Sequence, residues 1–226
     1  MAGPEERFTI DVASRGPVSA AYARPADAFA SLVVAHGAGA GMDHPFLTGF
    51  TRAMNDLGVA TLRFNFPYLE AGRRSTDSAP VAIAAWRAAF EAARSRAPGD
   101  EPVWAGGKSF GGRMASMAVA EGMPAAGLIF LGYPLHPPGK PDRLRADHLF
   151  EIRTPILFLQ GTADPFASRA VLDPVIERLG MRATLHAVEG GGHSLEVSRK
   201  QDPREVGASL APIVAAFVRK HRPRAR

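Results

Sequence analysis

The stretch "GGKSFGG" at residues 106–112 holds the side chains best suited to chemistry, and it fits two different motifs. Gly107, Lys108 and Ser109 match the end of a phosphate-binding loop, which cradles a nucleotide with backbone amides. Gly107, Ser109 and Gly111 match instead the G-x-S-x-G turn, which exposes a nucleophilic serine between a strand and a helix. The first interpretation implies ATP as a ligand, whereas the second requires a histidine and an acid later in the chain.

Nucleotide binding is the weaker interpretation. A phosphate loop ending at Lys108 needs its first glycine at position 102, where the chain has Pro102. The other glycine cluster, "HGAGAGMDH" at residues 36–44, has Met42 where a dinucleotide fingerprint needs its third glycine. The strand that follows carries Arg63 instead of the acid that would bind a ribose.

The nucleophile turn has partners in the required chain order. "PILFLQGTADPF" places Asp164 just beyond an apolar run, and "AVEGGGHSLE" places His193 in a glycine-rich loop. In such a set the histidine removes the serine proton, and the acid fixes the imidazole tautomer and stabilises its cation. We predict that Ser109, Asp164 and His193 are catalytic, the alternatives being an ordinary turn aspartate and an exposed loop histidine.

An oxyanion hole and two special glycines complete the predicted site. Backbone amides would stabilise the developing oxyanion, one from Phe110 and one from Ala38 in "HGAG", with Gly39 as the alternative donor. Gly107 and Gly111 are predicted as elbow glycines, because a side chain would clash at a strained turn. Without chemistry, both segments would be no more than tight turns.

Other polar residues receive structural interpretations. Lys108 is expected to be exposed, with attraction of acidic substrates as the alternative, and His36 is expected to hydrogen-bond within its own loop. Asp43 with His44 predicts a helix cap and no metal site. The chain has no cysteine, which excludes thiolate ligands, disulfides and a cysteine nucleophile. We predict no metal and no cofactor.

Short apolar runs alternate with longer alanine-rich amphipathic runs, a pattern that predicts an α/β fold with a mostly parallel sheet and helices on both faces. The first two strands should form an antiparallel hairpin. The expected strands are 8–13, 18–25, 31–37, 59–66, 102–109, 125–133, 154–161 and 182–190, and the expected helices are 44–57, 76–95, 110–121, 168–179 and 203–219.

Length and charge predict one domain at residues 1–218 and a basic tail at 219–226. The 226 residues are 46% hydrophobic and 22% charged, which is typical of a globular domain. Much of the net charge of +5 lies in the final "RKHRPRAR", so nucleic-acid binding is considered unlikely. Without a signal peptide or a long apolar run, we expect a cytoplasmic protein that does not enter the membrane. The oligomeric state stays open.

The segment at residues 134–153 is rich in proline and too short to form a large cap domain. We expect a strap with about one turn of helix and a shallow site, walled by Phe110, Met114 and the "FNFPY" loop. A shallow site buries few methylenes, each worth about 0.8 kcal/mol. Acetyl to butyryl esters should therefore be preferred over palmitoyl esters.

The chain also resembles the α/β-hydrolase superfamily, and within it the group that includes testis-expressed protein 30 and the hydrolase-like region of subunit 3 of the NSL complex. The similar stretches are "HGAGAGMDHPF", "RFNFPYLEAGRR", "GGKSFGGRM", "GYPLHPPGKPDRLRADHL", "LFLQGTADPF" and "GGGHSLE". The resemblance implies the eight-stranded α/β-hydrolase fold and a triad of Ser109, Asp164 and His193. It implies no substrate.

The expected function is that of a serine hydrolase, of carboxylesterase or thioesterase type, that cleaves a small-molecule ester through an acyl-enzyme. A perhydrolase or haloperoxidase could use the same residues. The alternative from another class is a catalytically weak protein of this fold that serves as a binding or scaffold protein.

Overall fold

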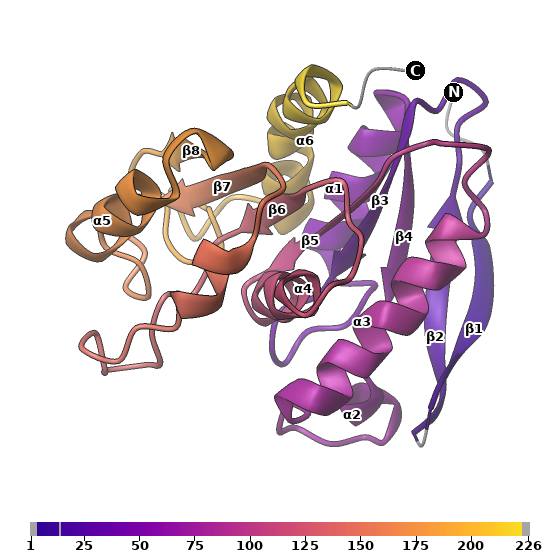
Figure 1. Cartoon of the computed structure of the whole chain (residues 1–226), viewed down its shortest axis with the longest axis horizontal. Helices are drawn as coiled ribbons and strands as arrows, with labels where there is room; N and C mark the ends of the chain where they lie inside the picture. Colours follow the sequence, from indigo (N-terminus) through magenta and orange to yellow (C-terminus); the bar gives the residue numbers. More distant parts are fainter. Residues whose placement is uncertain (1–3, 14, 223–226) are drawn as a thin grey trace.

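The computed structural model describes residues 4–13 and 15–222 (Figure 1). Eight strands form one sheet in the order β1-β2-β4-β3-β5-β6-β7-β8. Strand β2 pairs antiparallel with both β1 and β4, and every other neighbouring pair is parallel. The predicted eight-stranded, mostly parallel sheet with an opening hairpin is confirmed.

The elements agree with the predicted ones to within a few residues at each end. The strands are β1 (Glu6–Val12), β2 (Gly16–Ala23), β3 (Ala30–Ala35), β4 (Val59–Phe64), β5 (Val103–Lys108), β6 (Leu128–Leu131), β7 (Ile156–Gly161) and β8 (Ala183–Val188). The helices are α1 (Pro45–Asp56), α2 (Pro67–Glu70), α3 (Ala79–Arg94), α4 (Phe110–Ala120), α5 (Arg169–Leu179) and α6 (Pro203–Lys220). The 3-10 helices are η1 (Asp147–Glu151) and η2 (Gly180–Arg182). The short α2 and η2 were not predicted.

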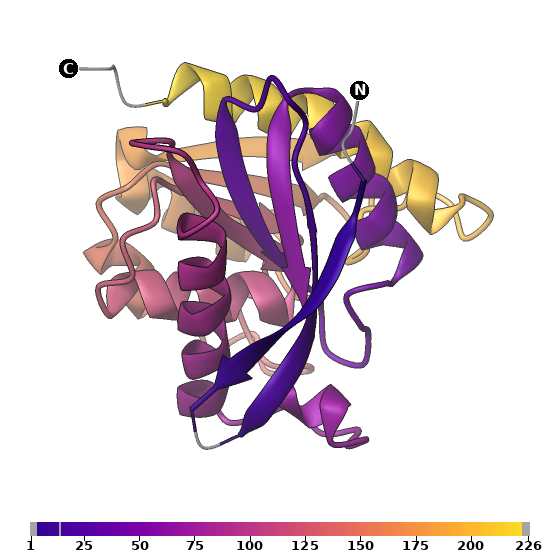
Figure 2. The same ribbon diagram turned by 90° about the vertical axis from the view of Figure 1, so that its right-hand side faces the viewer.

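Helices cover both faces of the sheet. Helices α3, α4 and α5 pack on one hydrophobic cluster, and α1 and α6 pack on the other. Figure 2 shows the strands between α3 on one side and α1 with α6 on the other. Helices α1 and α6 touch through two glycines: a Cβ atom on Gly49 would collide with the Arg204 carbonyl, and one on Gly207 with the Phe46 carbonyl. These two helices therefore lie backbone against backbone.

The central strands β3 and β5 set the position of the loops that matter for function. Ala35, at the end of β3, is paired in register with Gly107 on β5. All six residues of β3 are buried, as expected for a parallel strand covered on both faces. The loop that begins at His36 is thus placed beside Ser109, and the loops after β7 and β8 open at the same edge of the sheet.

The segment between β6 and β7 forms a strap. Its one regular element is η1, in agreement with the predicted single turn and the absence of a large cap. Backbone bonds hold it down, from the Leu135 amide to the Phe166 carbonyl and from the Arg145 amide to the Leu135 carbonyl. The strap is therefore tied to the segment that follows Asp164.

Helix α6 continues through residue 219, where the basic tail was expected to begin. The guanidinium of Arg219 lies over the ring of Phe29, 4.1 Å from its centroid. The last part of the expected tail, residues 223–226, lies outside the described residues. Within residues 4–13 and 15–222, no helix has the length and apolar character needed to cross a membrane.

Candidate active site

Ser109 lies on a strained turn between β5 and α4. Its φ of 49° and ψ of −112° are rare for a residue with a side chain. A Cβ atom on Gly107 would come within 2.6 Å of the Ala35 carbonyl oxygen, and one on Gly111 within 2.5 Å. Only glycine fits at either position. Because β5 runs straight into this turn, the amides before Lys108 belong to the sheet and do not encircle a phosphate.

The three residues predicted as catalytic form a chain of hydrogen bonds. The Nε2 atom of His193 lies 2.8 Å from the Ser109 hydroxyl oxygen, and its Nδ1 atom lies 2.7 Å from Oδ2 of Asp164. Asp164 is 1% exposed. When Asp164 is ionised, the Nδ1 proton points at the carboxylate and Nε2 is left to accept the serine proton.

Asp164 is held by donors that the sequence analysis did not single out. The side-chain amide of Gln160 donates to Oδ2 of Asp164, while its own oxygen accepts from the Tyr133 amide at 2.8 Å. The Phe166 amide donates to Oδ1 at 2.8 Å. The ring of Phe166 also packs against His193, with centroids 4.5 Å apart. The only signal in the sequence was a polar residue near the end of a buried strand, four positions before the acid, and this signal does not by itself indicate the contact.

In the loop after β3, Ala38 is a better candidate than Gly39 for the backbone amide that would bind the oxyanion. The Gly39 amide donates to the Tyr68 hydroxyl at 3.2 Å and is therefore committed elsewhere. Ala38 lines the cavity beside Ser109. The second predicted donor, Phe110, is the first residue of α4, and its ring packs against Phe66 with centroids 5.0 Å apart.

His36 holds the loop after β3 in place through contacts of both its ring nitrogens. Its Nδ1 atom lies 2.8 Å from the Gly37 carbonyl oxygen, as expected for a bond within the loop, and its Nε2 accepts from the Phe66 amide at 3.2 Å. Burial lowers the pKa of His36 to about 4. The neutral imidazole thus connects the loop after β3 to the loop after β4.

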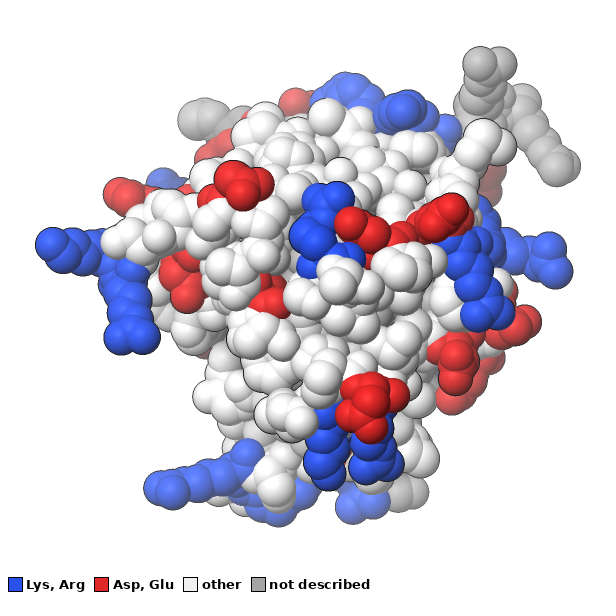
Figure 3. Space-filling view, turned by 90° about the vertical axis from the view of Figure 1, so that its left-hand side faces the viewer, with Lys and Arg blue, Asp and Glu red and all other residues white. Residues whose placement is uncertain are grey.

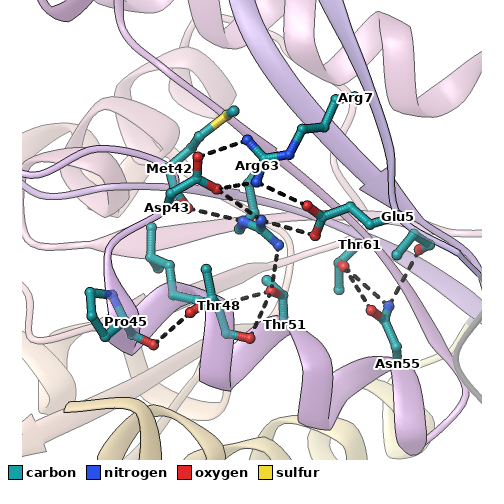
Figure 4. A network of polar contacts seen from close by, with 12 residues as sticks. Glu5, Arg7, Met42, Asp43, Pro45, Thr48, Thr51, Asn55, Thr61 and Arg63 are labelled. Carbon is teal, nitrogen blue, oxygen red and sulfur yellow. Dashed lines mark hydrogen bonds and ion pairs between the residues drawn. The ribbon is translucent and has the colours of Figure 1, made fainter.

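Arg63 fixes the far end of the same loop (Figure 4). Its buried guanidinium donates to the Met42 carbonyl and to the Thr51 hydroxyl, each at 2.9 Å. It also pairs with Asp43 at 3.3 Å and with Glu5 at 3.0 Å. One side chain of β4 therefore ties the glycine-rich loop to α1 and to the start of the chain.

The predicted cap at the start of α1 is made by His44, whose Nδ1 accepts from the Phe46 amide at 3.3 Å. Asp43 has a different role, because Arg7 donates two hydrogen bonds of 2.8 Å to its carboxylate. These bonds hold the pKa of Asp43 below its usual range. Among the described residues, no group of three or more His, Asp or Glu side chains is placed to hold a metal ion.

The expectation that Lys108 is exposed is wrong. The residue is largely covered, and its Nζ donates to the His193 carbonyl oxygen at 2.7 Å. Burial lowers the pKa of Lys108 to about 8, although the charges of Asp164 and Glu196 oppose this shift. This contact could not be predicted from the sequence, because it joins the strand before the elbow to the loop after β8.

A cavity of about 670 Å³ opens beside Ser109. Its apolar wall comes from Phe46 and Leu47 on α1 and from Val206 on α6. The three predicted walls do not line this cavity: Met114 is buried in the core, Phe110 packs against the cluster on the opposite face, and the lining includes no residue of the "FNFPY" loop. Met114 and Phe110 both follow Ser109 on α4, so their side chains point toward the hydrophobic cluster under α4. The cavity lies instead on the side of α1.

The sequence and the fold match those of known proteins. A sequence profile described as an alpha/beta hydrolase domain matches residues 28–219. The chain belongs to this alpha/beta hydrolase family. Its structure is similar to those of an alpha-beta serine hydrolase homologue from Coxiella burnetii (19% identity, TM-score 0.75, covering 94% of this chain and 97% of that one) and of a serine hydrolase without a lid from Xanthomonas campestris (22%, 0.74, 98% and 97%).

A third similar structure is the esterase domain of a Rhodothermus marinus protein, with 17% identity, a TM-score of 0.72, and coverage of 96% of this chain and 98% of that one. At such identities the likeness shows the fold alone. The α/β-hydrolase fold predicted from the sequence is confirmed.

Charged side chains of this α/β-hydrolase domain are interspersed on the side that carries α5 and β8 (Figure 3). Basic and acidic side chains alternate across it, and the described residues form no continuous basic surface on this face. A stripe of one sign is the usual footprint of a nucleic-acid-binding surface. This face therefore gives no support to a nucleic-acid partner.

Proposed function

We propose that this α/β hydrolase is a serine hydrolase, of carboxylesterase or thioesterase type, that cleaves small esters through an acyl-enzyme. The observation that carries the proposal is the chain of short contacts from Ser109 through His193 to Asp164. A serine hydroxyl is a weak nucleophile until an adjacent base takes its proton, and this arrangement supplies that base. The reaction written this way needs no metal or cofactor.

The contacts among these residues support the following proposed steps. Ser109 attacks the ester carbonyl carbon as its proton passes to Nε2 of His193, and Asp164 stabilises the imidazolium. The amides of Ala38 and Phe110 stabilise the oxyanion. The imidazolium then protonates the leaving alcohol or thiol as the carbon–oxygen or carbon–sulfur bond breaks. Water, deprotonated by His193, hydrolyses the acyl-enzyme and restores Ser109.

The substrate we propose is a small ester with a short acyl chain. The volume beside Ser109 is within the usual range for small-molecule sites, and the strap supplies no lid to enclose a long chain. The esterase domain from Rhodothermus marinus supports an ester substrate by analogy of fold. Acetyl, butyryl and palmitoyl esters compared by kcat/KM test this proposal, and a rise toward palmitoyl would contradict it.

Other features stay predictions from the sequence. The narrower resemblance to the group of testis-expressed protein 30 rests on the stretches quoted above and indicates no substrate. A single domain at residues 1–218 is predicted from length and charge, and a cytoplasmic location from the sequence pattern. Perhydrolase activity would use the same three residues.

Labelling with a fluorophosphonate probe tests the proposal, since it reports an activated serine without knowledge of the substrate. We expect one label per chain at Ser109, no label in Ser109→Ala, and a fall in turnover of at least about a thousandfold in that variant. Ser168→Ala is a matched control, because Ser168 is exposed at the start of α5 and its side chain makes no capping bond. Labelling that persists in Ser109→Ala would refute the assignment of Ser109 as the nucleophile. If the wild-type protein is never labelled, the scaffold alternative is favoured.

A further inference from the structure

Lys108 directly precedes Ser109 in the chain, is only partly exposed, and lies among the residues that line the cavity beside Ser109. Its stem passes beside Gly37, where a Cβ atom would lie 3.4 Å from Cγ of Lys108. Its Nζ lies 6.0 Å from the ring centroid of Phe46 and donates to the His193 carbonyl oxygen at 2.7 Å. One side chain thus touches the loop after β3, helix α1 and the loop that carries the histidine.

The His193 carbonyl is confined between two groups. Gly132 has a φ of 73°, and a Cβ atom there would lie 2.6 Å from the His193 oxygen, so the backbone after β6 closes one side. The ammonium of Lys108 closes another side, at hydrogen-bond distance. Beyond His193 the loop closes on itself, because the Gly192 amide donates to the Glu196 carbonyl at 2.9 Å and Leu195 adopts a φ of 68°.

We propose that Lys108 is a positioning residue that fixes the backbone of His193 and, through it, the contact between the imidazole and Ser109. This inference rests on the proposed serine hydrolase function. Because Lys108 and Ser109 are neighbours in the chain, the bond ties the base to the same turn that carries the nucleophile. Small displacements of a base relative to its nucleophile cost large factors in rate. Lys108 therefore acts through His193 and needs no contact with the substrate.

The charges around Lys108 fit this role better than recognition of an acidic substrate. Asp164, after β7, and Glu196, after β8, are the carboxylates whose fields act on the ammonium. The other contacts, from Gly37, Phe46 and Gly132, carry no titratable group, and His193 presents its carbonyl to the ammonium. A cation already compensated in this way attracts a substrate anion only weakly.

The same surroundings predict a dependence on pH. With a pKa of about 8, Lys108 is an ammonium at neutral pH and an amine in alkaline solution. The amine still reaches the His193 carbonyl, but a bond without the charge is weaker by roughly half. Turnover should fall as the pH rises through about 8. In Lys108→Arg this fall should move to higher pH, because guanidinium keeps its charge.

The test compares wild type with two variants. Lys108→Met keeps an unbranched stem that reaches as far as Cε and removes the ammonium donor. Lys108→Arg restores a charged donor. On p-nitrophenyl acetate near pH 7, Lys108→Met should lower kcat by about ten- to a hundredfold with little change in KM. Lys108→Arg should recover most of the loss. An unchanged kcat in a folded Lys108→Met variant would overturn the proposal. A raised KM with unchanged kcat would also overturn it, and would make Lys108 a substrate-binding residue.

Two measurements separate this inference from the proposed function. Fluorophosphonate labelling of wild type at Ser109 tests the function on its own. The proton NMR signal of His193 Nδ1–H, shifted far downfield by its bond to Asp164, tests the position of His193 without turnover. We expect Lys108→Met to broaden or lose this signal and Lys108→Arg to retain it; a signal unchanged in Lys108→Met would contradict the proposal. If Lys108→Met does not fold, the pH profiles of wild type and Lys108→Arg decide, and identical alkaline limbs would refute it.

Discussion

Replacing Asp164 by asparagine tests the site most sharply, because every polar partner of this carboxylate is a donor. Oδ1 accepts from the Phe166 amide, and Oδ2 accepts from Gln160 and faces Nδ1 of His193. Asparagine has one oxygen and one NH2 group. Whichever way it turns, its NH2 group meets a donor.

The conflict cannot be relieved by Gln160, since its oxygen already accepts from the Tyr133 amide. The simplest escape is for His193 to accept at Nδ1 and carry its proton on Nε2. That tautomer cannot take the proton of Ser109, and a change of this kind lowers kcat by about ten-thousandfold in a serine protease triad. A buried donor left without an acceptor costs about 1–3 kcal/mol, so the variant should fold with a lowered thermal midpoint.

The assay is the turnover of p-nitrophenyl acetate by wild type and Asp164→Asn, with circular dichroism to show that both are folded. Asp173→Asn is the matched control, because Asp173 forms an exposed ion pair with Arg169 on α5 and should not affect turnover. Folded Asp164→Asn that keeps more than about a tenth of the wild-type kcat would refute the tautomer argument and place the acid elsewhere.

Three further predictions concern the scaffold of the site. Gly111→Ala should lower the free energy of unfolding by about 1–3 kcal/mol or more, because its Cβ would lie 2.5 Å from the Ala35 carbonyl; an unchanged urea midpoint would contradict this. Arg63→Met should cost about 1–3 kcal/mol, because it leaves the buried Met42 carbonyl without its donor, whereas Arg94→Ala, which removes an exposed pair with Glu91, should leave the midpoint unchanged. The pKa of His36 is lower in the folded protein than in the unfolded chain. The free energy of unfolding should therefore be constant above about pH 6.5 and fall by about 1.4 kcal/mol per pH unit between there and about pH 4. His36→Gln should flatten this dependence in thermal melts, and an equal slope would count against it.

The regular elements were predictable because their signals are local. The alternation of apolar runs and the glycines around Ser109 are properties of neighbouring residues, and the order of serine, acid and histidine is set by the chain itself. Helix α2 was missed because its four residues, of which Pro67 is the first, are too few to show a helical periodicity. Gln160 was missed because a glutamine at the end of a strand has no meaning until the turn after it brings the Asp164 carboxylate back.

Other contacts between distant segments could not be predicted from the sequence. The burial of Lys108 depends on the loop after β8 lying over β5, and a lysine in a glycine-rich stretch is more often solvated. The position of the cavity depends on how closely α1 and α6 approach. That approach is set by Gly49 and Gly207, which are indistinguishable in sequence from other helical glycines.

The cavity wall and the loop that carries the histidine belong to one hydrophobic cluster. Phe46, Leu47 and Val206 pack in the same buried group as Leu195, two residues after His193. Met114 belongs to the cluster on the other face of the sheet, which is why walls predicted along α4 from Ser109 fell on the wrong side. A substitution that widens the cavity therefore also loosens the packing beneath the histidine loop, so that substrate size and turnover are coupled through these side chains.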